Sequence, residues 1–157
     1  ETPWCSGAAQ LINRRALQRS GLFDEHFFMY CEDVDLSWRM WAKGYRCIYE
    51  PRAKVWHEQG FTCNKGGQKD FYLGMRNGLM LRLLYGGWGK YTHHIFKMLK
   101  LALLDRHTDL IGRKLVLRAL VTHTKHLVHL LRRRRDLRHS ASHWAIRFYG
   151  WDYHPLR

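Results

Sequence analysis

Three short segments in the first sixty residues have the spacing of β-strands. Residues 4–12 are apolar and rich in small side chains, which favours a buried strand with close backbone contacts. Residues 46–49 alternate between polar and apolar side chains and stop at Pro51, and residues 53–56 form another short strand that ends at His57. Glycines at three positions within residues 58–67 predict a loop.

Other segments follow the three-and-four spacing of helices. Residues 14–19 form a short helical stretch that Gly21 can end. Residues 33–43 form a helix with carboxylates at its start and Gly44 after its end. From residue 68 onward, apolar side chains recur in three helical stripes. The stripes are Phe71, Met75, Leu79 and Leu83; Ile95, Met98, Leu99 and Ala102; and Leu117, Leu120, Val121, Thr124, Leu127, Val128 and Leu131.

Strands alternate with helices in the first part of the chain, and the second part is helical and basic. We therefore expect an α/β fold, seen from one edge, followed by amphipathic helices. No apolar run approaches the roughly 18–20 residues of a membrane-spanning helix, because Arg or Lys interrupts every candidate. The chain begins without Met or a signal peptide, so we expect a fragment from inside a longer protein.

Positive charge is concentrated in the second half of the chain. Of the formal net charge of +14, residues 1–78 carry +2 and residues 79–157 carry +12. Residues 113–138 combine an apolar stripe with many cations, including four arginines at 132–135, which is typical of helices in a membrane interface. The alternative is that the stripe packs on the rest of the domain and the charges are solvated. A nucleic-acid-binding module is a rival interpretation, although no nucleic-acid motif occurs.

The cysteines and histidines do not have the spacing of a metal or redox motif. No CxxC pair occurs, so we expect reduced thiols in a cytoplasmic protein. The cysteines are Cys5, Cys31, Cys47 and Cys63. Three histidines recur every third residue, which favours a polar face on a basic helix over a metal site. They are His123, His126 and His129.

Residues 21–39 carry the densest candidate chemistry. They read Gly-Leu-Phe-Asp-Glu-His-Phe-Phe-Met-Tyr-Cys-Glu-Asp-Val-Asp-Leu-Ser-Trp-Arg, followed by Gly44-Tyr45, Pro51 and Val55-Trp56-His57. Glu32, Asp33 and Asp35 lie within four residues, after an aromatic cluster and at the start of a predicted helix. The helix dipole favours an ionised carboxylate in this place, where it can accept a proton from a reacting group.

Residues 4–80 resemble the second half of family-2 glycosyltransferases of the GT-A type, in particular the rhamnosyltransferase-like members. That family has a small-residue strand, then G-x-F-D-E, F-F-x-Y-x-E-D-x-D-L-x-x-R, G-Y, P and V-x-H. All of these elements occur here in this order and at compatible spacing. Each element alone is a weak signal, and the ordered set is specific. The resemblance implies the C-terminal part of a GT-A domain without its donor-binding half.

The resemblance gives Asp33 the role of general base. In an inverting transfer from a nucleotide-diphosphate sugar, this carboxylate would deprotonate the acceptor hydroxyl during attack on the anomeric carbon. A divalent cation, Mg²⁺ or Mn²⁺, would neutralise charge on the leaving diphosphate, with His57 as an added ligand. The family's main metal motif, D-x-D, lies in the donor-binding half. The string Asp33-Val34-Asp35 opens a helix and is not expected to be that motif.

Each candidate carboxylate also has a structural interpretation. The alternative for Asp33 is a helix-capping carboxylate without chemistry. Supporting roles are expected for Glu32 and Asp35, with Asp35 paired to Arg39 across one helical turn. Asp24 is better suited to anchoring a turn or the acceptor loop than to catalysis.

The remaining candidates are aromatic or cationic. Trp4 and Tyr30 suit stacking on sugar rings and equally suit core packing. Arg76 lies where related enzymes place residues near the diphosphate or acceptor, and its alternative is a solvated helix surface. The alternative for His57 is a buried, hydrogen-bonded histidine.

The implied partners are a nucleotide-sugar donor and a glycan or lipid-linked acceptor in cell-envelope polysaccharide synthesis. Residues 1–84 would form the acceptor-side part of the catalytic domain, and residues 85–157 the basic helical extension. We expect a cytoplasmic protein that lies at the inner face of the cell membrane on an anionic surface, and nucleic acid is not favoured. The alternatives are a non-catalytic basic module that binds nucleic acid or anionic membrane, and a degenerate transferase that binds glycan without turnover.

Overall fold

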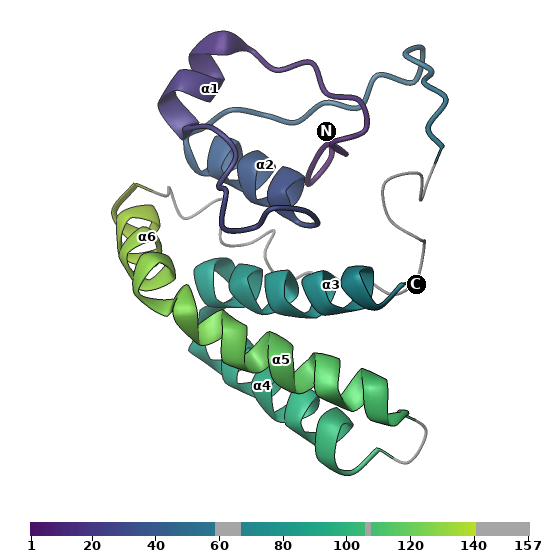
Figure 1. Ribbon diagram of the computed structural model, residues 1–157. Helices are drawn as coiled ribbons and strands as arrows, with labels where there is room; N and C mark the ends of the chain where they lie inside the picture. The colour runs from purple at the N-terminus through teal and green to yellow at the C-terminus, as the bar shows by residue number, and fades with distance from the viewer. Residues whose placement is uncertain (59–66, 106–107, 141–157) are drawn as a thin grey trace.

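The computed structural model describes residues 1–58, 67–105 and 108–140, in which helices are joined by turns and extended segments (Figure 1). Helix α5 packs against α3 and α4, and α6 packs against η1 and α2. None of the helices in these ranges is both long and apolar enough to cross a membrane. The elements are α1 (Arg14–Ser20), α2 (Glu32–Ala42), α3 (Gln68–Leu81), the π-helical turn η1 (Arg82–Gly86), α4 (Gly87–Leu103), α5 (Leu110–Lys125) and α6 (Leu127–Ser140).

The two helices predicted in the first half are confirmed to within a residue at each end. The side chain of Asn13 accepts hydrogen bonds from Arg15 N and Ala16 N, so it caps the start of α1. Gly21, at φ +82°, ends α1, and Gly44, at φ +83°, follows α2. Both glycines adopt a backbone conformation that other residues rarely take, which is why they stop the helices there.

The three predicted strands do not form among the described residues, so the α/β prediction is not confirmed there. Residues 4–12, 46–49 and 53–56 lack the ladder of paired N–H and C=O groups that defines a strand. Thr2 N donates to Cys47 O at 2.9 Å, so the chain just before residues 4–12 contacts the second of these regions. Exposed apolar side chains along the segments include Leu11, Ile48, Tyr49, Val55 and Trp56. Most of the predicted loop at 58–67, with Cys63, lies outside the described residues.

One hydrophobic core runs through both halves of the chain. It contains side chains from the loop before α2, from α2, and from all the later helices. The boundary predicted after residue 84 falls inside η1, and the core crosses it. The largest fully buried apolar side chains are Phe27, Leu36, Leu79, Met80, Leu83, Met98, Leu130, Val34 and Val116.

The third predicted stripe is wrong, because most of its residues lie beside the face that α5 and α6 bury. The chain also does not continue as one helix, since α5 and α6 meet at His126. Helix α5 buries Val116, Ala119 and His123, and α6 buries Leu130 and Arg134. Five of the seven members of the predicted stripe, namely Leu117, Val121, Thr124, Val128 and Leu131, are exposed instead, and Leu120 and Leu127 are partly buried against the core. The first stripe lies against the core, and so do Ile95, Met98 and Ala102 of the second.

Two neighbouring polar residues of α3 hold the loop of residues 24–31, which leads into α2. Asn77 is fully buried and donates from Nδ2 to three carbonyl oxygens of this loop at 2.7–2.8 Å. Arg76 is 8% exposed and donates to the carbonyls of His26 and Phe27, each at 2.9 Å. The solvated helix surface given as an alternative for Arg76 is therefore wrong.

The loop needs this support because its backbone is strained. Phe28, Tyr30 and Cys31 have φ angles of +61°, +68° and +70°. A side chain in this left-handed region costs on the order of 1 kcal/mol or more per residue. The hydrogen bonds from α3 offset that cost and fix the direction from which the chain enters α2.

A buried polar pair joins α4 to α5. Tyr91 Oη lies 3.0 Å from Nε2 of His123, a side chain that is 2% exposed. Burial, together with the charges of His126 and Arg76, lowers the pKa of His123 to about 4. His123 is therefore neutral in the folded state at neutral pH.

We predict that Asn77→Asp lowers the free energy of unfolding by about 3 kcal/mol. The substitution replaces the Nδ2 donor with an oxygen that faces buried carbonyls and leaves them unsatisfied. Urea unfolding followed by circular dichroism measures the loss. Asn13→Asp is the matched control, because a cap accepts hydrogen bonds and Asp accepts as well as Asn. Equal effects of the two substitutions would contradict the proposed role of Asn77.

We also predict that stability falls as the pH is lowered from 6.5 towards 4. In this window the unfolded chain protonates His123 at its ordinary pKa of 6.5, whereas the folded chain does so only near pH 4. The loss is on the order of 3 kcal/mol across the window. Thermal unfolding at a series of pH values measures it. The double variant Tyr91→Phe/His123→Phe should have a shallower slope in this window, and an unchanged slope would rule out His123 as the cause.

Candidate functional site

Asp33 lies in the first turn of α2, and each of its carboxylate oxygens accepts a backbone N–H. Oδ1 accepts from Val34 N at 2.8 Å, and Oδ2 accepts from Gly7 N at 2.9 Å. Gly7 belongs to the small-residue segment at 4–12, so two separate sequence motifs meet at this carboxylate. A Cβ atom on Gly7 would lie 3.6 Å from Asp33 Cβ, which is ordinary contact, so the N–H group matters here more than the missing side chain.

Glu32 precedes Asp33 and lies in a different environment. Burial raises the pKa of Glu32, its own backbone N–H lowers it, and the charge of Asp33 raises it further. Its Oε2 is buried and has no hydrogen-bond partner in the described part of the chain. Glu32 is therefore a carboxyl group that the fold makes harder to ionise, directly beside the predicted base.

Asp35 is fully buried, and its carboxylate is saturated with donors. Oδ2 accepts from Arg39 Nε at 2.9 Å, and Oδ1 accepts from Tyr85 Oη at 2.8 Å. Arg133 Nη2 contacts both oxygens, at 2.9 and 3.2 Å. The predicted pair between Asp35 and Arg39 is confirmed. A carboxylate with these partners is not available to a metal ion, which agrees with the exclusion of Asp33-Val34-Asp35 as a metal motif.

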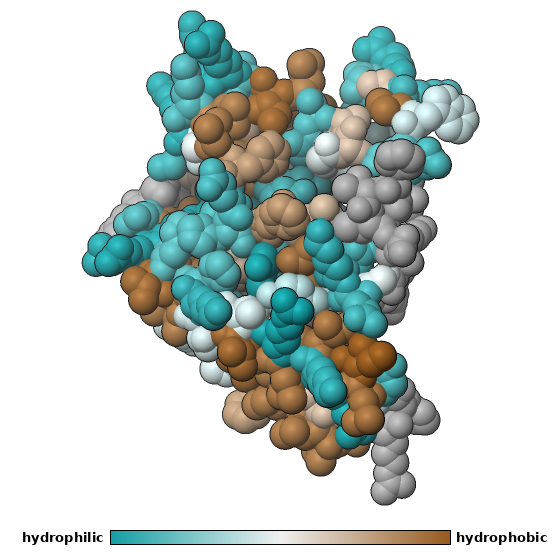
Figure 2. All heavy atoms as spheres, in the orientation of Figure 1, coloured by the Kyte–Doolittle hydropathy of each residue, from teal (hydrophilic) through white to brown (hydrophobic). Residues whose placement is uncertain are grey.

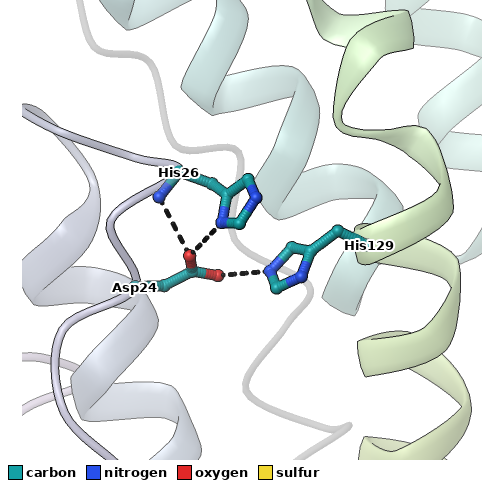
Figure 3. Close-up of side chains that lie close together, drawn as sticks. All are labelled: Asp24, His26 and His129. Atoms are coloured by element: carbon teal, nitrogen blue, oxygen red, sulfur yellow. Dashed lines mark hydrogen bonds and ion pairs between the residues drawn. The ribbon is translucent and has the colours of Figure 1, made fainter.

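Asp24 anchors the turn that begins the loop, as its structural interpretation predicted (Figure 3). Oδ1 accepts from the backbone N of His26 at 3.0 Å and lies 2.8 Å from its Nδ1. Oδ2 lies 3.0 Å from Nε2 of His129 and forms an ion pair with Arg133. Burial opposes ionisation of Asp24, but the hydrogen bonds from both histidines and the charge of Arg133 hold its pKa well below the ordinary value.

The histidines around Asp24 come from distant parts of the sequence. The rings of His26 and His129 stack with their centroids 3.8 Å apart, and His126 lies edge-on to His26 at 5.2 Å. The polar face predicted for three histidines is wrong, because His123 points into the core and His129 points at Asp24. In the described residues, Asp24, His26 and His129 place potential metal-ligand atoms within 4.8 Å of one another.

The sequence did not predict that His26, His129 and Arg133 contact Asp24. His129 was considered only with His123 and His126, and Arg133 only within the arginine run. His129 is separated from Asp24 by 105 residues, and no local pattern connects them. His26 lies only two residues after Asp24, but that spacing suggests a turn and not a ligand pair. The run of four arginines suggested a surface, whereas Arg133 turns inward to two carboxylates.

The other predicted residues lie apart from these carboxylate contacts. Trp4 and Tyr30 are partly buried against the core, and both of their interpretations stay open. Arg76 supports the loop, and a contact with a diphosphate stays a prediction. His57 is exposed, so the buried alternative is wrong, while its role as a metal ligand stays a prediction.

Several known proteins are similar to part of this chain. Proteins of two Mycobacterium tuberculosis strains named N-acetylglucosaminyl-diphospho-decaprenol L-rhamnosyltransferase are each 40% identical over 62 residues, which cover 40% of this chain and 20% of the relative. Rhamnosyltransferase WbbL of Escherichia coli is 39% identical over 54 residues, covering 34% of this chain and 20% of that protein. The matched segments therefore span about a fifth of these relatives.

No solved structure matches the chain. The match to a protein family is more extensive than the matches to single relatives. The model of the family described as "Glycosyl transferase family group 2" aligns with residues 2–151, which is nearly the whole chain. Because the match covers all of the described helices, the chain belongs to glycosyl transferase family group 2.

Proposed function

We propose that this protein transfers a sugar from a nucleotide-diphosphate donor to a hydroxyl group of a glycan or lipid-linked acceptor, with inversion at the anomeric carbon. Membership of the family supports glycosyl transfer, and the names of the three relatives support rhamnose as the sugar. The name of the two Mycobacterium tuberculosis proteins supports a lipid-linked acceptor. The donor would bind to a half of the catalytic domain outside these 157 residues. The product would be part of the cell envelope.

Asp33 is the proposed general base, and the hydrogen bond from Gly7 N to its Oδ2 is the observation that carries this assignment. That bond and the one from Val34 N fix the carboxylate at the N-terminus of α2. During transfer, Asp33 takes the proton of the acceptor hydroxyl, the acceptor oxygen bonds to the anomeric carbon, and the nucleotide diphosphate leaves. A positioned base of this kind contributes about 10²–10⁴-fold in rate.

The neighbouring residues have supporting roles in this proposal. Asp35 and Asp24 hold α2 and the preceding loop in place through their contacts with α6. Tyr30 belongs to this loop, Glu32 begins α2, and Trp4 is partly buried against the core. All three would contact the acceptor.

A divalent cation, Mg²⁺ or Mn²⁺, belongs to the proposed donor side, where it would neutralise charge on the leaving diphosphate. Asp35 does not fit as a ligand, since both of its oxygens are occupied by donors from the protein. His57 fits better, because its imidazole is exposed at the end of an extended segment. Arg76 would approach the diphosphate only by leaving the loop carbonyls that it now contacts.

The side chains of the hairpin formed by α4 and α5 support contact with an anionic membrane. Figure 2 shows hydrophobic side chains gathered over this end of the molecule, with hydrophilic ones between them. Exposed apolar residues here are Phe96, Leu103, Leu104, Leu110 and Ile111, and exposed cations are Lys97, Lys100 and Lys114. Apolar side chains flanked by lysines suit a surface of anionic lipids, where each Lys contributes about 1 kcal/mol.

The four-arginine run is a poorer membrane contact than the sequence suggested. Arg133 forms ion pairs with Asp24 and Asp35. Arg134 donates to the carbonyl of Leu83 and lies over the ring of Trp88. Two of the four charges are therefore used inside the fold, and the proposed contact moves to the α4–α5 hairpin.

The base assignment predicts that Asp33→Asn, made in the full-length enzyme, lowers turnover of the nucleotide sugar by at least about 10²-fold. Asn keeps an oxygen for the N–H of Gly7 but cannot take up the proton. Donor binding, measured by calorimetry with the nucleotide diphosphate, should change little. Asp136→Asn is the matched control, since Asp136 is exposed on α6, and it should leave turnover unchanged. Near-normal turnover by Asp33→Asn would show that another group is the base.

The membrane assignment predicts that Leu104→Gln/Leu110→Gln weakens binding to vesicles of phosphatidylglycerol and phosphatidylcholine by at least about tenfold. Both leucines are more than two-thirds exposed, at 70% and 74%, so the change should leave the fold intact. Leu11→Gln is the control, because Leu11 is a fully exposed leucine on another segment. Cosedimentation measures binding. Equal binding by all three proteins, or tighter binding to an oligonucleotide than to vesicles, would contradict the assignment.

A further inference from the structure

Two side chains of the loop of residues 24–31 and one of α6 form a compact set of metal-ligand atoms that the proposed transfer reaction does not use. We propose that Asp24, His26 and His129 bind a Zn²⁺ ion, which fastens this loop to α6. Asp24 and His26 come from the loop, and His129 comes from the first turn of α6 (Figure 3). The two imidazole rings lie side by side and point their nitrogens at the same carboxylate.

The distances suit a single ion after a small adjustment. Ligand atoms bound tetrahedrally to Zn²⁺ at about 2.0–2.1 Å lie about 3.4 Å from one another. In the structure, Asp24 Oδ1 lies 2.8 Å from His26 Nδ1, Oδ2 lies 3.0 Å from His129 Nε2, and all the ligand atoms lie within 4.8 Å. The ion would replace the hydrogen-bonded protons between carboxylate and imidazoles. Each neutral imidazole would then carry its proton on the other ring nitrogen.

The carboxylate ligand is nearly buried and the two imidazole ligands are partly exposed, which suits a metal site that is open to solvent on one side. The Asp24 side chain is 10% exposed, whereas those of His26 and His129 are 39% and 35% exposed. The imidazoles can therefore move apart to admit an ion, while the carboxylate stays fixed. Three protein ligands would leave a fourth position for water.

The ligand chemistry selects the class of metal. Two imidazoles and one carboxylate favour Zn²⁺ and similar transition ions, whereas Mg²⁺ prefers oxygen ligands. This Zn²⁺ site therefore differs in its ligands and its metal from the proposed Mg²⁺ or Mn²⁺ site at the donor diphosphate.

Arg133 is the group that opposes a cation here. It forms ion pairs with two carboxylates, Asp24 and Asp35, and these balance its positive charge. Asp35 in turn is paired with Arg39, so the four formal charges of this network sum to zero before any ion binds. Because the carboxylate of Asp24 has two oxygens, one can bind the ion while the other stays with Arg133, which then orients the ligand.

The first experiment is calorimetry of the full-length protein with Zn²⁺, in the absence of nucleotide sugar and with Mg²⁺ present. Wild type should bind Zn²⁺ at this site, and His26→Gln and His129→Gln should each weaken that binding at least about tenfold. His93→Gln is the matched control, because His93 is exposed on α4, and it should bind as wild type does. Absence of binding by wild type, or unchanged affinity in both ligand variants, would overturn the proposal.

A second measurement uses the wild-type protein, so its result does not depend on whether a variant folds. Diethyl pyrocarbonate modifies accessible imidazoles, and mass spectrometry locates the modified residues. Zn²⁺ should protect His26 and His129 together while leaving His93 as reactive as before. If either His26 or His129 reacts equally with and without Zn²⁺, the two do not share an ion and the proposal fails.

Discussion

The buried carboxylate of Asp35 is the contact on which the arrangement of the helices depends. It is fully buried and accepts hydrogen bonds from Arg39 on α2, Tyr85 on η1 and Arg133 on α6. A buried charge is tolerated only where it is paired and hydrogen-bonded, and removal of one partner of such a pair costs about 3–5 kcal/mol. The contact extends in two directions. Arg39 also donates to carbonyls at the end of α1, and Arg133 also pairs with Asp24.

The loop before α2 is therefore held from two sides by the second half of the chain. Helix α3 supplies Asn77 and Arg76 to its carbonyl groups, and α6 supplies Arg133 and His129 to Asp24. Between these supports the backbone passes through three residues with positive φ and delivers Asp33 to the first turn of α2. Strain that is compensated in this way fixes the position of a side chain more closely than an unstrained loop would. The basic helices are thus part of the structure that positions the carboxylates.

Features that depend on residues close together in the sequence could be predicted, whereas contacts between residues far apart in the sequence could not. The ends of α1 and α2 followed from glycines that stop helices, and the pair of Asp35 with Arg39 followed from a spacing of four. The contact of His129 with Asp24 spans 105 residues, so no local pattern could reveal it. The prediction of three strands failed for a similar reason. A strand forms only when another segment of the chain pairs with its backbone N–H and C=O groups. Periodicity also did not identify the buried face of α5 and α6, because the apolar side chains of the third stripe run beside the residues that these helices bury.

Some cationic side chains face solvent and others are buried in the fold, so a basic composition alone does not locate a binding surface. Successive residues of a helix point about 100° apart, so four arginines in a row cannot all face one partner. Arg132 and Arg135 are exposed, whereas Arg133 and Arg134 turn to the acidic loop and to η1. Part of the net charge therefore neutralises buried carboxylates within the fold. The lysines of the α4–α5 hairpin differ, since they are exposed and lie among exposed apolar side chains, and that combination is what an anionic lipid surface requires.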